Sequence, residues 1–394
     1  MELTGKTILI LSPQCWGKML ISKHHYAISL AKRGNQVYFL NPPNDPLPSG
    51  RKVQVKPSGL HENLLIIDQA LYFPYNLKFH ALPVFHYLMK RQIKKILQAI
   101  GRPVDIAWSF DIGHFYPFRH FSQSILKIFH PVDEPLSPIS IAAAEGADII
   151  FSVTNEILDK YAHLSTPRYF INHGLTNEFL GSSVQEKAAD IKTVRAGFSG
   201  NLLRNDIDRE AMLQIIRENG EVVFECWGSY KVGDSNIGGS ENREQVAFIR
   251  ELQQCSNVVL HGAVGTKELA AGFRNIDIFL ICYDVQKDQS RGTNYHKVME
   301  YLSTGKVIVS NNITTYRDQP ELVSMVSDRQ SNGHLPALFR EVAGNLVSWN
   351  SLPLQEKRVA YARDNTYEKQ VDRIENILLA YRKGKSRLES NAKA

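Results

Sequence analysis

The chain has 394 residues, which suits two or three domains rather than one hydrophobic core. Hydrophobic residues make up 43% and charged residues 22%, as in soluble globular proteins. The net charge of +6 is too diffuse to indicate nucleic-acid binding, but it suits anionic ligands or an anionic membrane surface.

The cysteines and the apolar runs exclude several further classes of protein. The four cysteines are far apart and form no Cys-x-x-Cys pair, so neither a zinc site nor a disulfide framework is indicated. We therefore expect a reducing, cytoplasmic environment. Residues 1–12 lack the basic stretch and the cleavage site of a secretory signal. Runs such as residues 147–153 are far shorter than the ~18 apolar residues of a membrane span.

Strand-like and helical runs alternate in the first half of the chain. Residues 6–12 and 35–43 are predicted strands, and residues 22–34 are a predicted helix that ends at Gly34. This order is typical of a parallel α/β unit. Further strand-like runs follow at residues 64–68, 105–110, 126–132, 148–153 and 168–174.

The same alternation restarts after a polar, linker-like stretch at residues 181–194. The predicted strands are residues 194–200, 222–228, 258–262, 277–283 and 306–312, with helices at 208–219, 242–255 and 266–275. We therefore predict an α/β protein of two doubly wound, Rossmann-like domains that face each other across a cleft. Their bounds are 1–180 and 190–365, and a C-terminal helix and tail occupy residues 366–394.

One short helix, within residues 292–312 (GTNYHKVMEYLSTGKVIVSNN), has two different sides. Lys297 and Glu300 are three positions apart and so lie side by side, opposite an apolar side. They form either a solvated ion pair or the border of a ligand site. In the second case, the helix N-terminus at residues 292–295 would offer free N–H groups to an anion.

This segment resembles the C-terminal signature of glycosyltransferases of the GT-B fold, K-x-x-E-Y-L-x-x-G-K-x-V-V. Residues 168–179, 196–203 and 258–282 are similar to other segments of that family, in the same order. The first half matches loosely, at residues 22–42 and 130–158. The resemblance leans toward the subgroup that includes glucuronosyltransferases of exopolysaccharide assembly. It implies a nucleotide diphosphate sugar donor, with uridine as the expected base.

The resemblance also implies roles for single residues. Glu300 would accept hydrogen bonds from the ribose diol, and Lys297 and Arg204 would offset the charge of the diphosphate. Gly200 would let the backbone approach a phosphate, although an ordinary strand-to-helix turn is an alternative. The other residues expected at the donor site are Gly17, Asn201, Tyr283, Asn294 and Tyr295.

Neither a metal nor another cofactor is expected, because the nucleotide sugar is a substrate. The pair Asp206 and Asp208 has the Asp-x-Asp spacing that binds a divalent metal in a different glycosyltransferase fold. Here the pair precedes a predicted helix, and we expect it to cap the free N–H groups there.

Inversion of the sugar's configuration requires a base that deprotonates the acceptor hydroxyl. Asp133 and then Asp111 are the candidates, since each follows a predicted strand of the first half and a similar family segment holds the suspected base. A turn-capping role is the alternative for each. Retaining members of the fold often carry Glu-x7-Glu, but eight positions before Glu300 this chain has Gly292, so inversion is favoured.

Residues 71–101 mix aromatic side chains with cations, a combination that suits a bilayer interface, where lipid-linked acceptors are presented. A core helix with a basic outer face is the alternative. The aromatic residues are Tyr72, Phe73, Tyr75, Phe79, Phe85 and Tyr87, and the cations are Lys90, Arg91, Lys94 and Lys95. The protein would then reside in the cytoplasm, on the inner face of the plasma membrane.

The predicted function is transfer of a sugar from a UDP-sugar to a glycan or lipid-linked glycan in cell-surface polysaccharide synthesis. Two alternatives stay open. A nucleotide-sugar 2-epimerase would share the fold and need no acceptor. A non-catalytic sugar-nucleotide-binding protein would fit the missing first glutamate and the glycine-poor first loop. A dehydrogenase is not expected, because neither first turn contains G-x-G-x-x-G.

Overall fold

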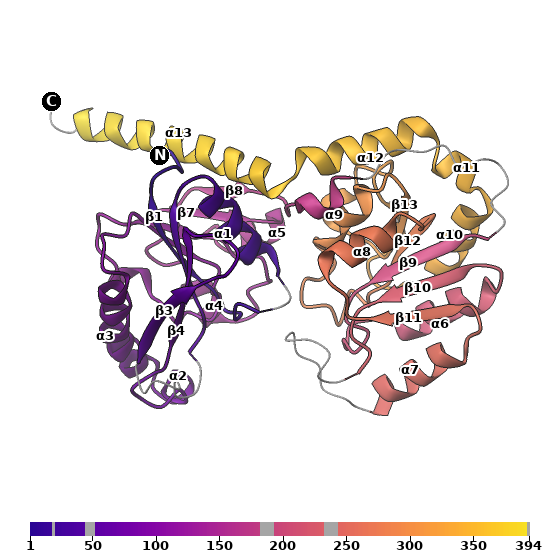
Figure 1. The fold of residues 1–394 in the computed structure, drawn as a ribbon, viewed down its shortest axis with the longest axis horizontal. Helices are drawn as coiled ribbons and strands as arrows, with labels where there is room; N and C mark the ends of the chain where they lie inside the picture. The colour runs from indigo at the N-terminus through magenta and orange to yellow at the C-terminus, as the bar shows by residue number, and fades with distance from the viewer. Residues whose placement is uncertain (18–19, 44–51, 182–192, 232–242, 392–394) are drawn as a thin grey trace. The chain divides into compact units, whose positions relative to one another are not determined.

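The computed structural model describes residues 1–17, 20–43, 52–181, 193–231 and 243–391, which form two compact units (Figure 1). Unit 1 comprises residues 1–172 and 367–394, and unit 2 comprises residues 173–366. The C-terminal helix, which the sequence suggested as a separate segment, thus groups with unit 1. Most of the expected linker at 181–194 lies outside the described residues.

Unit 1 contains an eight-stranded sheet with the strand order β3-β4-β2-β1-β5-β6-β7-β8. All neighbouring strands are parallel except β3 and β4, which are antiparallel. The strands are β1 (Thr7–Leu11), β2 (Gln36–Leu40), β3 (Val53–Pro57), β4 (Leu64–Gln69), β5 (Ile106–Ser109), β6 (Leu126–Phe129), β7 (Ile149–Ser152) and β8 (Arg168–Phe170).

Helices cover both faces of this sheet. They are α1 (Ser22–Lys32), α2 (Leu77–His80), α3 (Leu82–Ile100), α4 (Pro138–Ala142), α5 (Asn155–Asp159) and α13 (Tyr367–Asn391). Alternate residues of β1 point into different cores, Leu9 and Leu11 into one and Ile8 and Ile10 into the other. Burial on both faces explains why the strands of a parallel sheet read as continuous apolar runs.

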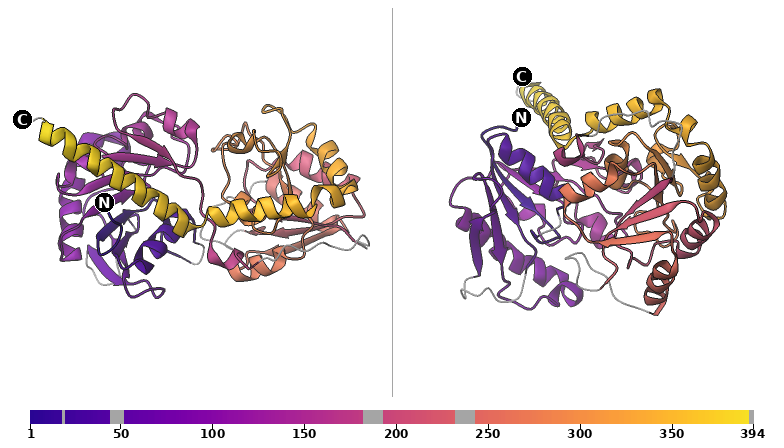
Figure 2. Two further views of the ribbon diagram at one scale, coloured as in Figure 1. Left: turned by 90° about the horizontal axis from the view of Figure 1, so that it is seen from above. Right: turned by 45° about the vertical axis from the view of Figure 1, so that its right-hand side comes forward.

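The last helix, α13, completes one of the two cores of unit 1. Tyr367 meets the ring of Tyr26 edge-on at 5.3 Å and stacks on His25 at 4.9 Å. Val371, Ile374 and Leu378 continue the same apolar cluster. The left view of Figure 2 shows α13, in yellow, running along unit 1.

Unit 2 contains a six-stranded, fully parallel sheet with the strand order β11-β10-β9-β12-β13-β14. The strands are β9 (Arg195–Ser199), β10 (Val223–Trp227), β11 (Val258–Gly262), β12 (Ile278–Ile281), β13 (Val307–Ser310) and β14 (Ser324–Met325). The helices are α6 (Arg209–Glu218), α7 (Arg243–Gln254), α8 (Thr266–Phe273), α9 (Lys297–Leu302), α10 (Leu335–Gly344), α11 (Leu346–Trp349) and α12 (Leu352–Asp364).

The strand orders confirm the predicted pair of doubly wound sheets. In unit 2 the chain order reverses between β9 and β12, and in unit 1 it reverses between β1 and β5. Ligands of open α/β sheets bind at such switch points, beyond the carboxyl ends of the strands. None of the described helices is both long and apolar enough to cross a bilayer.

Candidate functional site

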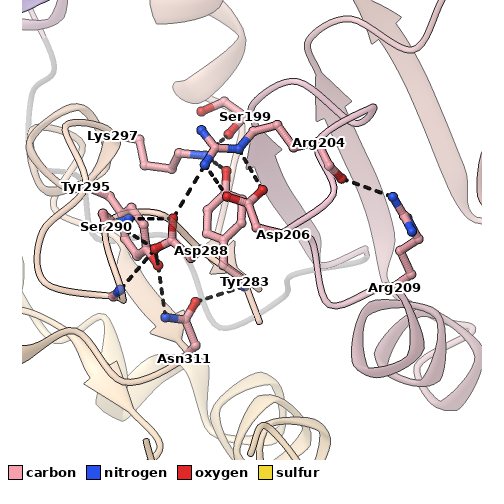
Figure 3. A network of polar contacts seen from close by, with 11 residues as sticks. Ser199, Arg204, Asp206, Arg209, Tyr283, Asp288, Ser290, Tyr295, Lys297 and Asn311 are labelled. Carbon is pink, nitrogen blue, oxygen red and sulfur yellow. Dashed lines mark hydrogen bonds and ion pairs between the residues drawn. The ribbon is translucent and has the colours of Figure 1, made fainter. Parts of the chain in front are cut away.

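The switch point of unit 2 brings three segments together (Figure 3). β9 ends at Ser199 and is followed by Gly200, while Tyr283 comes two residues after the end of β12. Residues 284–296 then lead to α9, whose first residue is Lys297. Four residues predicted at the donor site, Gly200, Arg204, Tyr283 and Lys297, therefore lie close together.

Lys297 joins the two strand ends. Its ammonium donates to the Ser199 carbonyl at 2.5 Å and to the Tyr283 hydroxyl, and it lies 4.7 Å from the centre of the Tyr283 ring. The residue is only 5% exposed. Burial lowers the pKa of Lys297 to about 7. A solvated ion pair with Glu300 is therefore the wrong interpretation, and no ion pair between the two is found within the described ranges.

Glu300 follows one turn later on α9. Its carboxylate is half-buried, and no residue in the described part of the chain donates a hydrogen bond to it. Burial raises the pKa of Glu300 to about 7, although the Lys297 charge acts in the opposite direction. The structure thus leaves a carboxylate with two open acceptor oxygens beside a buried cation.

Two glycines permit the close approach of these segments. A Cβ atom on Gly200, where φ is +150°, would lie 2.8 Å from the Lys297 ammonium nitrogen. A Cβ atom on Gly228, just after β10, would lie 1.9 Å from the Gly200 carbonyl oxygen. Gly228 was not among the predicted site residues, but its position directly after a strand, like that of Gly200, is a signal that could have identified it.

Most of the Arg204 guanidinium is already bound to carboxylates. Its guanidinium donates to both oxygens of Asp206, with Nε 2.7 Å from Oδ1, and lies 3.5 Å from Asp288. The hydrogen bonds to Asp206 raise the pKa of Arg204 above its ordinary value. Nη1 contacts no acceptor within the described ranges, and the side chain is nearly half exposed. Only this edge of the guanidinium is therefore open to an anion.

Asp288 organises the loop before α9. Its carboxylate accepts hydrogen bonds from the Ser290 hydroxyl at 2.5 Å, the Gly292 N–H at 3.0 Å and the Tyr295 hydroxyl at 2.7 Å (Figure 3). Burial alone would raise the pKa of Asp288, but these hydrogen bonds outweigh it and lower the pKa. Sequence reasoning missed this residue; an acid followed by Ser and Gly is the turn signal that marks it.

This loop overturns one expectation. A helix N-terminus with free N–H groups was predicted at residues 292–295, but α9 begins at Lys297 and has His296 as its N-cap. The Gly292 N–H is already bound to Asp288. The prediction was wrong because Gly292 has a left-handed backbone, with φ of +63°, that no helix contains.

The other predicted donor residues lie in or beside this cluster, with one exception. Asn294 and Tyr295 are buried in the loop before α9, and the Tyr295 ring lies 5.0 Å from that of Tyr283. The Asn201 side chain accepts the Leu203 N–H at 2.9 Å. Gly17 instead belongs to unit 1, in the loop after β1.

The predicted capping role of the Asp-x-Asp pair is confirmed for its second member. Asp208 is the N-cap of α6, and its side chain accepts the Ala211 N–H at 3.1 Å. Asp206 binds Arg204 instead. Within the described ranges, no three His, Cys, Asp or Glu side chains are arranged to hold a metal ion.

Asp111 lies at the switch point of unit 1, directly beyond β5. It is buried, and its carboxylate oxygens accept the N–H groups of Gly113 at 2.8 Å and Phe115 at 2.7 Å. Burial raises the pKa of Asp111 even though these hydrogen bonds oppose the change. Asp111 lines a cavity of about 660 Å³ together with Ser12 and Tyr75.

Asp133 lies beyond the neighbouring strand β6 and is exposed. A buried cation, Lys23 in the first turn of α1, interacts electrostatically with both Asp133 and Asp111 and donates to the Gln14 side chain. Burial lowers the pKa of Lys23 to about 8, whereas the two acids act to raise it. Sequence reasoning missed Lys23, although a lysine in the first turn after β1 is a recognisable signal.

Comparison with known proteins shows what this architecture is similar to. No protein-family model and no curated protein sequence matches the chain. Sucrose-phosphate synthase from Thermosynechococcus elongatus superposes with a TM-score of 0.69 and 12% identity, over 95% of this chain and 99% of that chain. The lipopolysaccharide outer core galactosyltransferase WaaB gives 0.61 and 13%, over 93% and 98%. HepE from Anabaena, in complex with UDP-glucose, gives 0.63 and 9%, over 95% and 100%.

At these identities the likeness shows the fold and not the activity. The similar structures are of GT-B proteins and match almost the whole length of both chains, so the agreement extends to both units and their order. The glucuronosyltransferase-like subgroup stays a prediction. The chain therefore has the GT-B fold.

Proposed function

We propose that the protein is a glycosyltransferase that moves a sugar from a UDP-sugar to a glycan or lipid-linked glycan. The observation that carries this proposal is the juxtaposition at the unit 2 switch point of buried Lys297 and the open Glu300 carboxylate. A cation and a free acceptor one helical turn apart match a diphosphate and a ribose diol. The complex of the similar protein HepE with UDP-glucose supports this choice of donor. The role in cell-surface polysaccharide synthesis stays a prediction.

The donor is held from both sides of the switch point. The Lys297 ammonium donates two of its three N–H groups to the Ser199 carbonyl and the Tyr283 hydroxyl, so one N–H group is left for a phosphate oxygen. Nη1 of Arg204 is a second donor, and Gly200 leaves space beside both. As the bond between the anomeric carbon and the diphosphate breaks, negative charge develops on the leaving group, and these cations stabilise it.

The acceptor hydroxyl oxygen forms the new bond to the anomeric carbon, and its proton goes to a carboxylate. We assign this role to Asp133, because it is exposed at the carboxyl end of β6 and no residue within the described ranges donates a hydrogen bond to it. Asp111 is second, since both of its oxygens already accept backbone N–H groups. Attack by an acceptor from the side opposite the leaving group inverts the sugar's configuration.

A thermal-shift panel of nucleotides and nucleotide sugars tests the donor site. A ligand that binds only the folded state stabilises it by about 2.7 kcal/mol at a hundredfold excess over Kd. We expect UDP and a UDP-sugar to raise Tm and adenosine and guanosine diphosphates to do so less. Glu300→Gln should reduce the UDP effect, whereas Glu341→Gln, an exposed position on α10, should not change it. An unchanged UDP effect in Glu300→Gln would refute the assigned role.

Two reactions distinguish the alternative functions. Incubation with the donor alone would produce an isomerised sugar if the protein were a 2-epimerase. Stabilisation by UDP, with no turnover of any donor in the presence of acceptors, would identify a non-catalytic binding protein. Glycosylated product that forms only when donor and acceptor are both present supports the proposal.

A further inference from the structure

A long stretch of unit 1 contains no acid. Residues 69–104 include no Asp or Glu, whereas six of them are Lys or Arg. The six are Lys78, Lys90, Arg91, Lys94, Lys95 and Arg102. This stretch covers α2 and α3, so both helices present an excess of positive charge.

The outer face of α3 is divided into an apolar and a basic half. Val84 and Tyr87 are 49% and 59% exposed, and Arg91 and Lys94 follow on the same helix face. The opposite face, with Phe85 and other apolar residues, packs into the core of unit 1. A core helix with a basic outer face would explain the cations, but it does not explain the exposed Val84 and Tyr87.

The apolar half continues onto α2 and the residues just before it. Tyr75 and Phe79, whose rings are 5.6 Å apart, are 45% and 66% exposed. Four of the ten large exposed hydrophobic side chains found among the described residues therefore fall within 75–87. We call this group, with the neighbouring cations, the α2–α3 surface. It consists of Tyr75, Phe79, Val84, Tyr87, Lys90, Arg91, Lys94 and Lys95.

The four cations of this surface have no acidic partner in the described part of the chain. Arg91 lies over the ring of Tyr87 at 5.5 Å, and Lys95 lies over the ring of Tyr72 at 4.4 Å. Aromatic rings leave the positive charge in place, unlike carboxylates. The surface therefore attracts an anionic partner and at the same time exposes apolar side chains for burial.

We propose that the α2–α3 surface docks on an anionic lipid bilayer. Tyr75, Phe79 and Tyr87 would enter the boundary between headgroups and acyl chains, where amphipathic rings are favoured. The cations of α3 would contact lipid phosphates. Exposed apolar and basic residues without a single intervening acid fit a bilayer better than a protein partner, whose surface carries charges of both signs.

The docking surface shares a residue with the unit 1 cavity. Tyr75 lines that cavity, and its ring lies 5.6 Å from Phe115, whose N–H is bound by Asp111. Docking would therefore bring the cavity next to the bilayer. If the proposed function holds, the acceptor class is an amphiphile anchored in the membrane, and its headgroup enters this cavity. This last step rests on the proposed function, whereas the docking itself does not.

Vesicle flotation tests the docking. Vesicles of phosphatidylcholine alone are compared with vesicles that also contain phosphatidylglycerol, at low and high salt. We expect binding to the anionic vesicles that weakens at high salt. Lys90→Gln with Lys94→Gln should weaken binding by about fivefold for each removed charge. Phe79→Ser with Tyr87→Ser should also weaken binding, including at high salt.

Matched substitutions elsewhere serve as controls. Lys267→Gln, an exposed position on α8, and Val347→Ser, a 69% exposed position on α11, should leave flotation unchanged. All variants should keep the Tm and the UDP response of the unmodified protein, which separates loss of docking from loss of the donor site. The proposal is overturned if anionic vesicles do not bind. It is equally overturned if the basic pair alone matters and an oligonucleotide competes fully, because the partner would then be a nucleic acid.

Discussion

The Lys297 ammonium lies 2.5 Å from the carbonyl oxygen of Ser199, and it thereby fastens the start of α9 to the end of β9. The cation is thus held at the switch point before any ligand arrives, so little conformational entropy remains to be lost on binding. Because the same burial brings the pKa values of both Lys297 and Glu300 to about 7, the charge of the site depends on pH near neutrality.

We expect the affinity for a UDP-sugar to be highest near pH 7. The ligand needs Lys297 protonated and Glu300 ionised. Above pH 7 Lys297 loses its proton, and below pH 7 Glu300 gains one, so affinity falls by up to about tenfold per pH unit on each side. Calorimetric titrations with a UDP-sugar at several pH values around 7 measure this affinity. A UDP-sugar is preferred to UDP because a terminal phosphate titrates near pH 6 itself.

Two variants test which residue causes the loss of affinity on each side of pH 7. Glu300→Gln should remove the weakening at acidic pH, and Lys297→Met should remove the weakening at alkaline pH. Both should also lower the affinity at pH 7. A pH-independent Kd in the unmodified protein would show that neither Lys297 nor Glu300 has a pKa near 7.

Gly228→Ala should destabilise unit 2 strongly. The new Cβ atom would lie 1.9 Å from the Gly200 carbonyl oxygen, and φ at Gly228 is +133°, so both a clash and backbone strain result. We expect the free energy of unfolding to fall by about 3 kcal/mol or more. Urea denaturation measures it. Gly220→Ala is the control, since a Cβ atom there meets nothing within 4 Å, and a similar loss in both variants would contradict the packing argument.

Asp288→Asn should destabilise the loop before α9 by about 2–4 kcal/mol, because an amide cannot accept all the hydrogen bonds of the carboxylate and offers no charge to Arg204. The folded-state pKa of Asp288 is lowered, so its stabilisation is present above the ordinary aspartate pKa of about 3.9 and is lost as the pH falls further. Denaturation at neutral and acidic pH measures both effects. The exposed Asp318→Asn should show neither.

Asp133→Asn should lower kcat by about 10²- to 10⁴-fold, the usual contribution of a general base. Since Asp133 is exposed, this substitution should not change the free energy of unfolding of the protein. Asp111→Asn, by contrast, should cost about 1–3 kcal/mol of stability, because its oxygens accept two backbone N–H groups. Full turnover by the Asp133→Asn variant would show that the base is Asp111 or another residue.

Much of the fold was predictable from the sequence because the central strands are continuous apolar runs. β1 and β12 are buried along their whole length, and helices such as α6 show a clear apolar face. β3 was missed, since it pairs only with β4 at the edge of the sheet and its residues are half-exposed or exposed. An edge strand of this kind has no strong apolar pattern to find.

The site was predictable in its location and less so in its contacts. Glycines after strands and the Lys297–Glu300 spacing pointed to the switch point of unit 2. The role of Asp288 was not predictable, because it depends on a loop folding back onto one carboxylate. The burial of Lys23 and Lys297 likewise follows from tertiary packing, and helical periodicity alone places a lysine on the solvent side.

The return of α13 to unit 1 affects how the protein is made. Tyr367, Val371, Ile374 and Leu378 fill a core whose other buried members come from residues 1–171. A ribosome synthesises all of unit 2 before it releases these residues, so the apolar side chains of α1 that contact α13 stay uncovered until then. Unit 1 therefore cannot complete its hydrophobic core before unit 2 has been synthesised.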